Sequence, residues 1–218
     1  MRIGIIVFPG SNRENDVYKP FDILCDIKPL FLWHQDTNIP PVDLIVVPGG
    51  FSYGDYLRAG AIAARSPIMK EVIRLANKGT PVLGICNGFQ ILIESGLLPG
   101  ILLRNTHLKF ICKIVKIKVV NNTSIFTHLY QKDQIVHFPV AHHDGNYYAD
   151  HALLNDLEQN DQIAFQYIDN PNGSIRDIAG IYNKQKNVLG LMPHPENVAY
   201  QGFNNIEDGR ALFQGLIH

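Results

Sequence analysis

In the first half of this chain, a cysteine stands between two different structural patterns. Residues 84–90 have the sequence GICNGFQ; an apolar run, residues 81–83, precedes them and a helix-like stretch, residues 91–94, follows. A cysteine at a strand-to-helix turn lies beside the free N–H groups of a helix N-terminus, which favour the thiolate that a nucleophile needs. Cys86 is therefore the candidate nucleophile. The alternative is a buried core thiol, the usual state of a lone cysteine.

A histidine and a glutamate two residues apart follow a second apolar run. Residues 188–192 lead into Pro193-His194-Pro195-Glu196. In an extended chain, residues i and i+2 point the same way, so Glu196 can hold the imidazole tautomer of His194. His194 can take the thiol proton and later donate it to a leaving amine. These residues predict acyl transfer by a Cys86, His194 and Glu196 triad; the alternative for Glu196 is a solvated loop carboxylate.

Acyl transfer also needs hydrogen-bond donors for the developing oxyanion. The backbone N–H groups of Gly50 and Asn87 are the candidates, and Gly50 has no side chain to keep a substrate away from its amide. The alternative for Gly49-Gly50 is a simple turn. Residues 10–12 (GSN) are too short for a dinucleotide fingerprint and equally fit an N-cap of the following helix.

Apolar runs alternate with helical patterns in the first half of the chain. Strands are expected at residues 2–8, 30–33, 43–47 and 81–85, and helices at 14–25 (with Pro20 as a point of interruption), 68–78 and 87–94. This alternation predicts a parallel sheet covered on both faces. Reactive groups of such sheets collect beyond the carboxyl ends of the strands. Gly50, Cys86 and His194 each follow a predicted strand, so we expect them at one edge.

The second half is richer in β-branched residues. Strands are expected at residues 109–120, 135–140, 163–167, 178–182 and 188–192, and a terminal helix at 207–216. This part is expected to be partly antiparallel. No repeat, linker or low-complexity tract divides the sequence, which predicts one domain over residues 1–218 with an α/β, mixed and mostly parallel sheet.

Composition excludes several classes of function. Of 218 residues, 46% are hydrophobic and 18% charged, and the net charge of −1 disfavours a nucleic-acid groove or a polybasic membrane anchor. No apolar run approaches the roughly 18 residues that span a bilayer. The three cysteines lack paired spacing, which predicts no disulfide framework and a reducing, cytoplasmic location.

Metal and nucleotide sites are not expected in this chain. The acidic and histidine side chains between residues 137 and 151 (His137, His142, His143, Asp144 and His151) lack the tight spacing of a zinc site. No G-x-x-x-x-G-K-[ST] sequence occurs, so no P-loop for ATP is predicted.

Together, GICNGFQ and His194-Pro195-Glu196 resemble the class I (triad) glutamine amidotransferases. Residues 8–12 (FPGSN), 49–60 (GGFSYGDYLRAG), 104–105 (RN) and 108–110 (LKF) are similar to the glutaminase subunits of phosphoribosylformylglycinamidine synthase, which acts at the fourth step of purine biosynthesis. This resemblance runs over nearly the whole chain. The resemblance implies a flavodoxin-like class I amidotransferase fold.

The resemblance also implies an activity and partners. Glutamine is hydrolysed at Cys86 through a γ-glutamyl thioester, and ammonia passes inside the protein to a large synthetase subunit. That subunit, with its ATP and Mg²⁺, converts formylglycinamide ribonucleotide to the amidine, and a small third subunit joins the two. No cofactor is implied in this chain.

Further site residues follow from the resemblance alone. Gln90 matches a position that contacts glutamine; the alternative is a polar residue facing along its helix. The family usually has His-x-Glu-Gly where residues 142–145 are HHDG, so His143 and Asp144 are substrate-binding candidates with a shorter carboxylate. Arg58, near Asp55, either faces the synthetase or forms a surface pair.

Three rival functions stay open at this point. An amidotransferase of another pathway, such as GMP or anthranilate synthesis, would carry Gly-Gly-Pro where Phe51 stands. A stand-alone cysteine hydrolase of related fold would lack the His-Pro-Glu segment and the signature at residues 49–55. A non-catalytic regulatory module would not hydrolyse glutamine.

Overall fold

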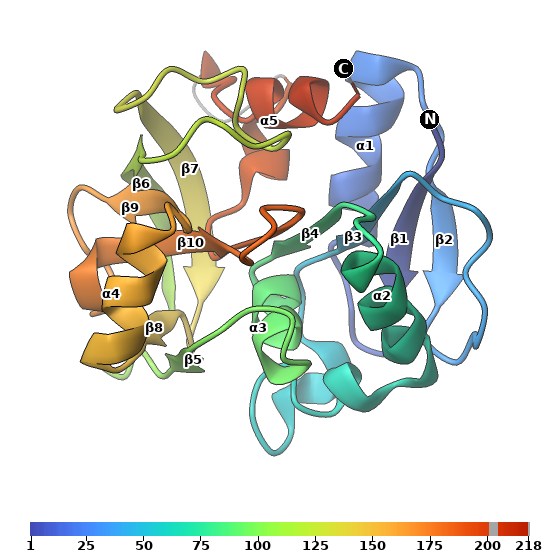
Figure 1. The fold of residues 1–218 in the computed structure, drawn as a ribbon, viewed down its shortest axis with the longest axis horizontal. Helices are drawn as coiled ribbons and strands as arrows, with labels where there is room; N and C mark the ends of the chain where they lie inside the picture. The colour runs from blue at the N-terminus through green and yellow to red at the C-terminus, as the bar shows by residue number, and fades with distance from the viewer. Residues whose placement is uncertain (201–204, 218) are drawn as a thin grey trace.

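The computed structural model describes residues 1–200 and 205–217. Among these residues, nine strands form one sheet in the order β2-β1-β3-β4-β11-β10-β9-β6-β7 (Figure 1). The parallel part comprises β2 (Leu30–Trp33), β1 (Ile3–Val7), β3 (Leu44–Val47), β4 (Val82–Ile85) and β11 (Val188–Leu191). The antiparallel part adds β10 (Ile178–Tyr182), β9 (Ile163–Tyr167), β6 (Ile111–Val119) and β7 (Ile135–His142).

These pairings decide the direction of every strand in the sheet. β10 runs against β11, β9 against β10, β6 against β9 and β7 against β6. By this alternation only β10 and β6 oppose the parallel part, and the other seven of the nine strands run one way. The predicted α/β class with a mixed, mostly parallel sheet is confirmed. The carboxyl end of β7 therefore lies on the same edge as those of β3, β4 and β11.

Parallel strands need crossover connections, and two helices lie in them: α1 (Glu14–Cys25), from β1 to β2, and α2 (Pro67–Asn77), from β3 to β4. The described residues also form α3 (Asn87–Glu94), α4 (His151–Gln159) and α5 (Arg210–Gly215). Helix α1 packs against β1 and α5, whereas α3 packs against β3, β4 and β11. Figure 1 shows α1 beside α5 at the top of the view and α2 and α3 lower down. Every residue of β3, β4 and β11 is buried, as expected for strands covered on both faces.

Several elements differ from the expected ones. Helix α1 continues through Pro20, where an interruption was expected, because Pro20 and Phe21 are buried on its inner face and this packing offsets one lost backbone hydrogen bond. The strands β5 (Ile101–Leu103) and β8 (Asn146–Tyr148), which pair with each other, and helix α4 were not predicted. The signal for α4 was present: Asp150 caps it by accepting from the Leu153 N–H at 2.8 Å.

Of the two alternatives left open for Arg58, a surface pair is present, with Glu94 as its partner. Arg58 donates from Nε and Nη2 to the two carboxylate oxygens of Glu94, both at 2.6 Å, instead of pairing with Asp55. Among the described residues, no helix combines the length and apolar character that a membrane span requires.

Candidate active site

Cys86 is the single residue between β4 and α3. Its φ of 51° and ψ of −105° are strained for a residue with a side chain, a conformation that costs about 1–3 kcal/mol. Two backbone hydrogen bonds hold it there. Its N–H donates to the Leu191 carbonyl at 2.8 Å, and its carbonyl accepts from the Gln90 N–H at 3.1 Å. The turn therefore presents the thiol at the carboxyl edge of the sheet, as predicted.

The two glycines around Cys86, Gly84 and Gly88, allow close packing. A Cβ on Gly88 would lie 1.9 Å from the Val47 carbonyl oxygen, and one on Gly84 would lie 2.4 Å from Leu92 Cδ1. Neither glycine has a positive φ. The strain falls on Cys86 itself, because the glycines are needed where α3 meets the ends of β3 and β4.

His194 and Glu196 form a buried pair beside the thiol. The His194 ring and the Glu196 carboxylate meet with Nδ1 and Oε1 at 2.6 Å, and the exposed fractions of the two residues are 1% and 2%. The His194 N–H donates to the Pro139 carbonyl at 2.8 Å, which fixes the segment against β7. Burial lowers the pKa of His194, but the charges of Glu196 and Cys86 outweigh burial and raise it. The structure thus brings the three predicted triad residues together.

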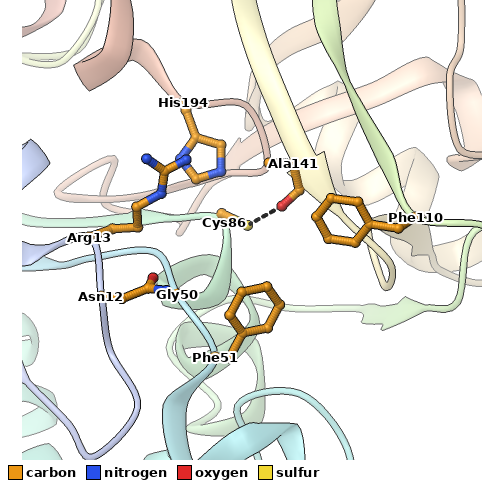
Figure 2. A pocket seen from close by; sticks show the side chains of 8 residues that line it. All are labelled: Asn12, Arg13, Gly50, Phe51, Cys86, Phe110, Ala141 and His194. Atoms are coloured by element: carbon orange, nitrogen blue, oxygen red, sulfur yellow. Dashed lines mark hydrogen bonds between the residues drawn. The ribbon is translucent and has the colours of Figure 1, made fainter.

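A pocket of about 300 Å³ opens beside the cysteine. Its lining residues are Asn12, Arg13, Gly50, Phe51, Cys86, Phe110, Ala141 and His194 (Figure 2). The Cys86 thiol contacts the Ala141 carbonyl at 3.8 Å, drawn as a dashed line in Figure 2. Phe51 and Phe110 supply apolar walls, and the polar groups gather near the sulfur. The pocket can hold a small substrate with an apolar stem and a reactive polar end.

Of the predicted oxyanion donors, Gly50 lines this pocket. Its φ of +128° favours glycine, and a Cβ there would lie 2.9 Å from the Asn12 backbone nitrogen. Ser11 pairs with Gly50 in an isolated bridge, and α1 is capped at Arg13 without a side-chain bond, so residues 10–12 do not cap that helix. The N–H of Asn87 lies in the first turn of α3, where helix geometry leaves it without a helical partner. The oxyanion role of both groups stays a prediction.

The Asn87 side chain anchors the loop after Gly50. Its Oδ1 accepts from the Ser52 N–H at 3.1 Å, and its Nδ2 donates to Gln90 Oε1 at 2.8 Å and to Asp55 Oδ1 at 3.3 Å. The short 3-10 helix Ser52–Asp55 contains left-handed residues, among them Tyr53 at φ 53°. These bonds hold strained backbone next to Gly50 and Phe51.

The structure does not bring the substrate-binding candidates into the pocket lining. Gln90 donates to the Asp144 carbonyl at 2.7 Å and accepts from Asn87, so its amide is occupied at both ends. The Asp144 carboxylate lies 3.3 Å from Arg104 Nε and 3.7 Å from His143 Nδ1. The roles of Gln90, His143 and Asp144 stay predictions.

Ala141 had no sequence signal, Phe110 was noted only as part of the LKF segment of the resemblance, and Arg13 was missed although a signal existed. Ala141 and Phe110 come from β7 and the approach to β6, and only the sheet order brings them beside Cys86. Arg13 follows the GSN segment after β1, at the same sheet edge as Cys86. Within the described residues, no group of three or more His, Cys, Asp or Glu side chains could hold a metal ion.

We predict that Glu196→Gln lowers kcat for hydrolysis at Cys86 by about 10²–10⁴-fold, because the imidazolium of His194 loses its buried counter-charge. The measurement is single-turnover and steady-state kinetics of the purified variant. Glu207→Gln, at an exposed carboxylate paired with Arg210, is the control for a lost carboxylate. Full activity of Glu196→Gln would contradict the assignment of Glu196.

The Asp55 carboxyl is expected to make the stability of the folded chain depend on pH. Burial and the nearby Asp144 charge raise its pKa from 3.8 to about 6, against the lowering effect of Asn87. The folded state therefore binds the Asp55 proton more tightly than the unfolded state does. The resulting gain in the free energy of unfolding is fully present below about pH 4 and is lost as the pH rises through 6. Asp55→Asn should stabilise the chain by about 1 kcal/mol at pH 7.5, after allowance for solvent screening, and by less at pH 5. Thermal unfolding of the parent chain and Asp55→Asn at both pH values measures this difference in stability. Asp169→Asn, at an exposed carboxylate, is the control. If Asp55→Asn changes the stability by the same amount at pH 7.5 and pH 5, the prediction is refuted.

Comparison with known proteins shows which family this chain is similar to. The family model for the CobB/CobQ-like glutamine amidotransferase domain matches residues 1–214. The phosphoribosylformylglycinamidine synthase subunits PurQ of Zymomonas mobilis and Mesorhizobium japonicum are 54% and 53% identical, over 100% of this chain and 98% of each relative. A chain in the structure of PurLQS from Thermotoga maritima is 42% identical, with a TM-score of 0.90 over 99% of this chain and 97% of its own.

Proposed function

Because this chain belongs to the CobB/CobQ-like glutamine amidotransferases, and among them to the PurQ subunits of phosphoribosylformylglycinamidine synthase, we propose that it hydrolyses glutamine at Cys86. Residues 1–218 act as one amidotransferase domain. The observation that carries this proposal is the buried His194–Glu196 pair beside Cys86, on a pocket open to a small substrate.

The reaction proceeds in two steps at the sulfur. The Cys86 thiolate attacks the γ-carbonyl carbon of glutamine, and the oxyanion is stabilised by the N–H groups of Gly50 and Asn87. The imidazolium of His194 gives its proton to the departing nitrogen, the C–N bond breaks, and ammonia leaves a γ-glutamyl thioester. Water then attacks the thioester carbonyl as His194 takes its proton, and glutamate leaves with the thiolate restored.

Ammonia passes to a synthetase subunit in the same complex. The similar chain of Thermotoga maritima was solved as part of PurLQS, which supports such an assembly. In our proposal the large subunit carries the ATP and Mg²⁺, it converts formylglycinamide ribonucleotide to the amidine, and a small third subunit joins the complex. This chain itself needs no cofactor for hydrolysis, and the cytoplasm is its proposed location.

Covalent labelling with a glutamine chloroketone tests the proposal. The chain, alone and with its synthetase partner, is treated with the reagent, and its intact mass is measured. We expect one adduct, prevented by excess glutamine, lost in Cys86→Ala and retained in Cys112→Ala, which removes the exposed cysteine. An adduct that survives Cys86→Ala, or no adduct in the complex, would refute the proposal.

A further inference from the structure

A guanidinium stands in the pocket next to the triad. Arg13 lines the same cavity as Cys86 and His194, and Figure 2 shows its side chain rising beside the His194 ring. Arg13, Cys86 and His194 all lie close to Gly49. A Cβ placed on Gly49 would lie 3.0 Å from His194 Cε1, 3.5 Å from Arg13 Cγ and 3.6 Å from Cys86 Cβ. The stem of Arg13 therefore packs at the meeting point of the nucleophile and its base.

Arg13 is held in place by a carboxylate of its own helix. It is the N-cap residue of α1, and its Nη1 donates to Asp16 Oδ2, in the first turn of that helix, at 2.5 Å. The exposed fraction of the Arg13 side chain is 31%, so most of it is shielded from water. A charge held by one bond on a helix end and shielded elsewhere acts on its neighbours more strongly than a free surface arginine does.

The neighbouring negative groups act on Arg13. Burial lowers the pKa of Arg13, but the bond to Asp16 and the charges of Glu196 and Cys86 together raise it. Because charge interactions are mutual, the guanidinium stabilises negative charge on Glu196 and Cys86 in turn. A nearby positive charge stabilises the Glu196 carboxylate in particular, because its Oε2 is buried and has no hydrogen-bond partner among the described residues.

The other groups that face Cys86 and His194 do not supply a permanent positive charge. Tyr167 on β9 is buried, which raises its pKa and keeps the phenol neutral. His142 at the end of β7 donates from Nδ1 to Asn105 Oδ1, and burial lowers its pKa to about 3, so it is neutral as well. His194 and Glu196 are the triad partners themselves. Within the described part of the chain, Arg13 is thus the fixed cation of the pocket.

We propose that Arg13 is a positioning residue of the glutaminase site, whose guanidinium favours the thiolate of Cys86 and the carboxylate of Glu196 and so extends cysteine reactivity to lower pH. This inference rests on the proposed function and assigns a role to a residue outside the triad. It requires no contact between Arg13 and glutamine.

The test is the pH dependence of Cys86 alkylation by iodoacetamide, without glutamine, followed by peptide mass spectrometry between pH 5 and 10. Arg13→Met removes the charge and keeps the stem. We expect its midpoint to rise by about half to one pH unit, which is about 3- to 10-fold slower labelling below the midpoint. Arg13→Lys should stay close to the parent, and high salt should narrow the difference between parent and Arg13→Met.

Arg58→Met is the matched control, because Arg58 forms its pair with Glu94 on the surface and does not line the pocket. It should leave the profile unchanged. Superimposable profiles of the parent and Arg13→Met would overturn the proposal. So would an unchanged profile with a raised KM for glutamine, since the guanidinium would then contact the substrate. Arg13→Gln replaces Arg13→Met if that variant does not fold.

Repeating the alkylation of the parent chain in the presence of glutamine separates the two proposals. If glutamine does not protect Cys86 of the parent chain from alkylation, the proposed function fails whatever Arg13 does. If glutamine protects Cys86 and the Arg13→Met profile does not move, only the role of Arg13 fails.

Discussion

Cys86→Ser is expected to lower glutamine hydrolysis by at least about 10³-fold while the chain stays folded. The replacement changes one atom at a position that is already strained, at φ 51°, and both side chains are similar in size. The loss is chemical. A serine hydroxyl is far harder to deprotonate than a thiol. The measurement is glutamate production by the purified chain with its synthetase partner.

External ammonia supplies the control for this variant. If this subunit serves only to release ammonia, ammonium added at high concentration should restore synthesis of the amidine by the complex that contains Cys86→Ser. Cys112→Ser, at the exposed cysteine of β6, should leave glutamine hydrolysis unchanged. Substantial glutamine hydrolysis by Cys86→Ser would show that another group is the nucleophile.

Gly88→Ala is expected to prevent stable folding, with a loss of more than about 4 kcal/mol in the free energy of unfolding. Two effects compete at this position. Alanine favours a helix over glycine by about 1 kcal/mol, which would stabilise α3. Against this, the new Cβ would lie 1.9 Å from the Val47 carbonyl oxygen and 2.7 Å from the Val47 carbonyl carbon. Backbone atoms of a buried strand cannot give way as a flexible side chain can, so the clash prevails.

Gly79→Ala is the control for the cost of alanine at a special glycine. Gly79 has a φ of +97°, but a Cβ there meets nothing within 4 Å. Its replacement should cost only the backbone strain, about 1–2 kcal/mol. Urea unfolding of both variants makes the comparison. If Gly88→Ala is as stable as Gly79→Ala, α3 does not approach β3 as closely as we describe.

The sequence by itself predicted Cys86, His194 and Glu196 as a triad, and the structure brings the three residues together. The strand-to-helix turn at Cys86 and the His194-Pro195-Glu196 segment are local patterns. The strands and helix that flank them are recognised from the spacing of apolar residues that are close in sequence. The rule that reactive groups collect at the carboxyl ends of parallel strands then placed them at one edge without any knowledge of the strand order. Helix α3 and strands β2, β9 and β10 have the bounds that were expected for the same reason.

Only the tertiary structure decided what surrounds that triad. Arg13 reaches the pocket from the segment between β1 and α1, whereas Phe110, just before β6, and the Ala141 carbonyl, on β7, reach it from the opposite end of the sheet order. Arg58 pairs with Glu94 and Gln90 bonds to the Asp144 carbonyl, contacts that no short-range pattern encodes. Residue type and spacing report local conformation. Which side chains share a cavity depends on long-range packing of the whole sheet, and that packing alone sets a cation beside the nucleophile.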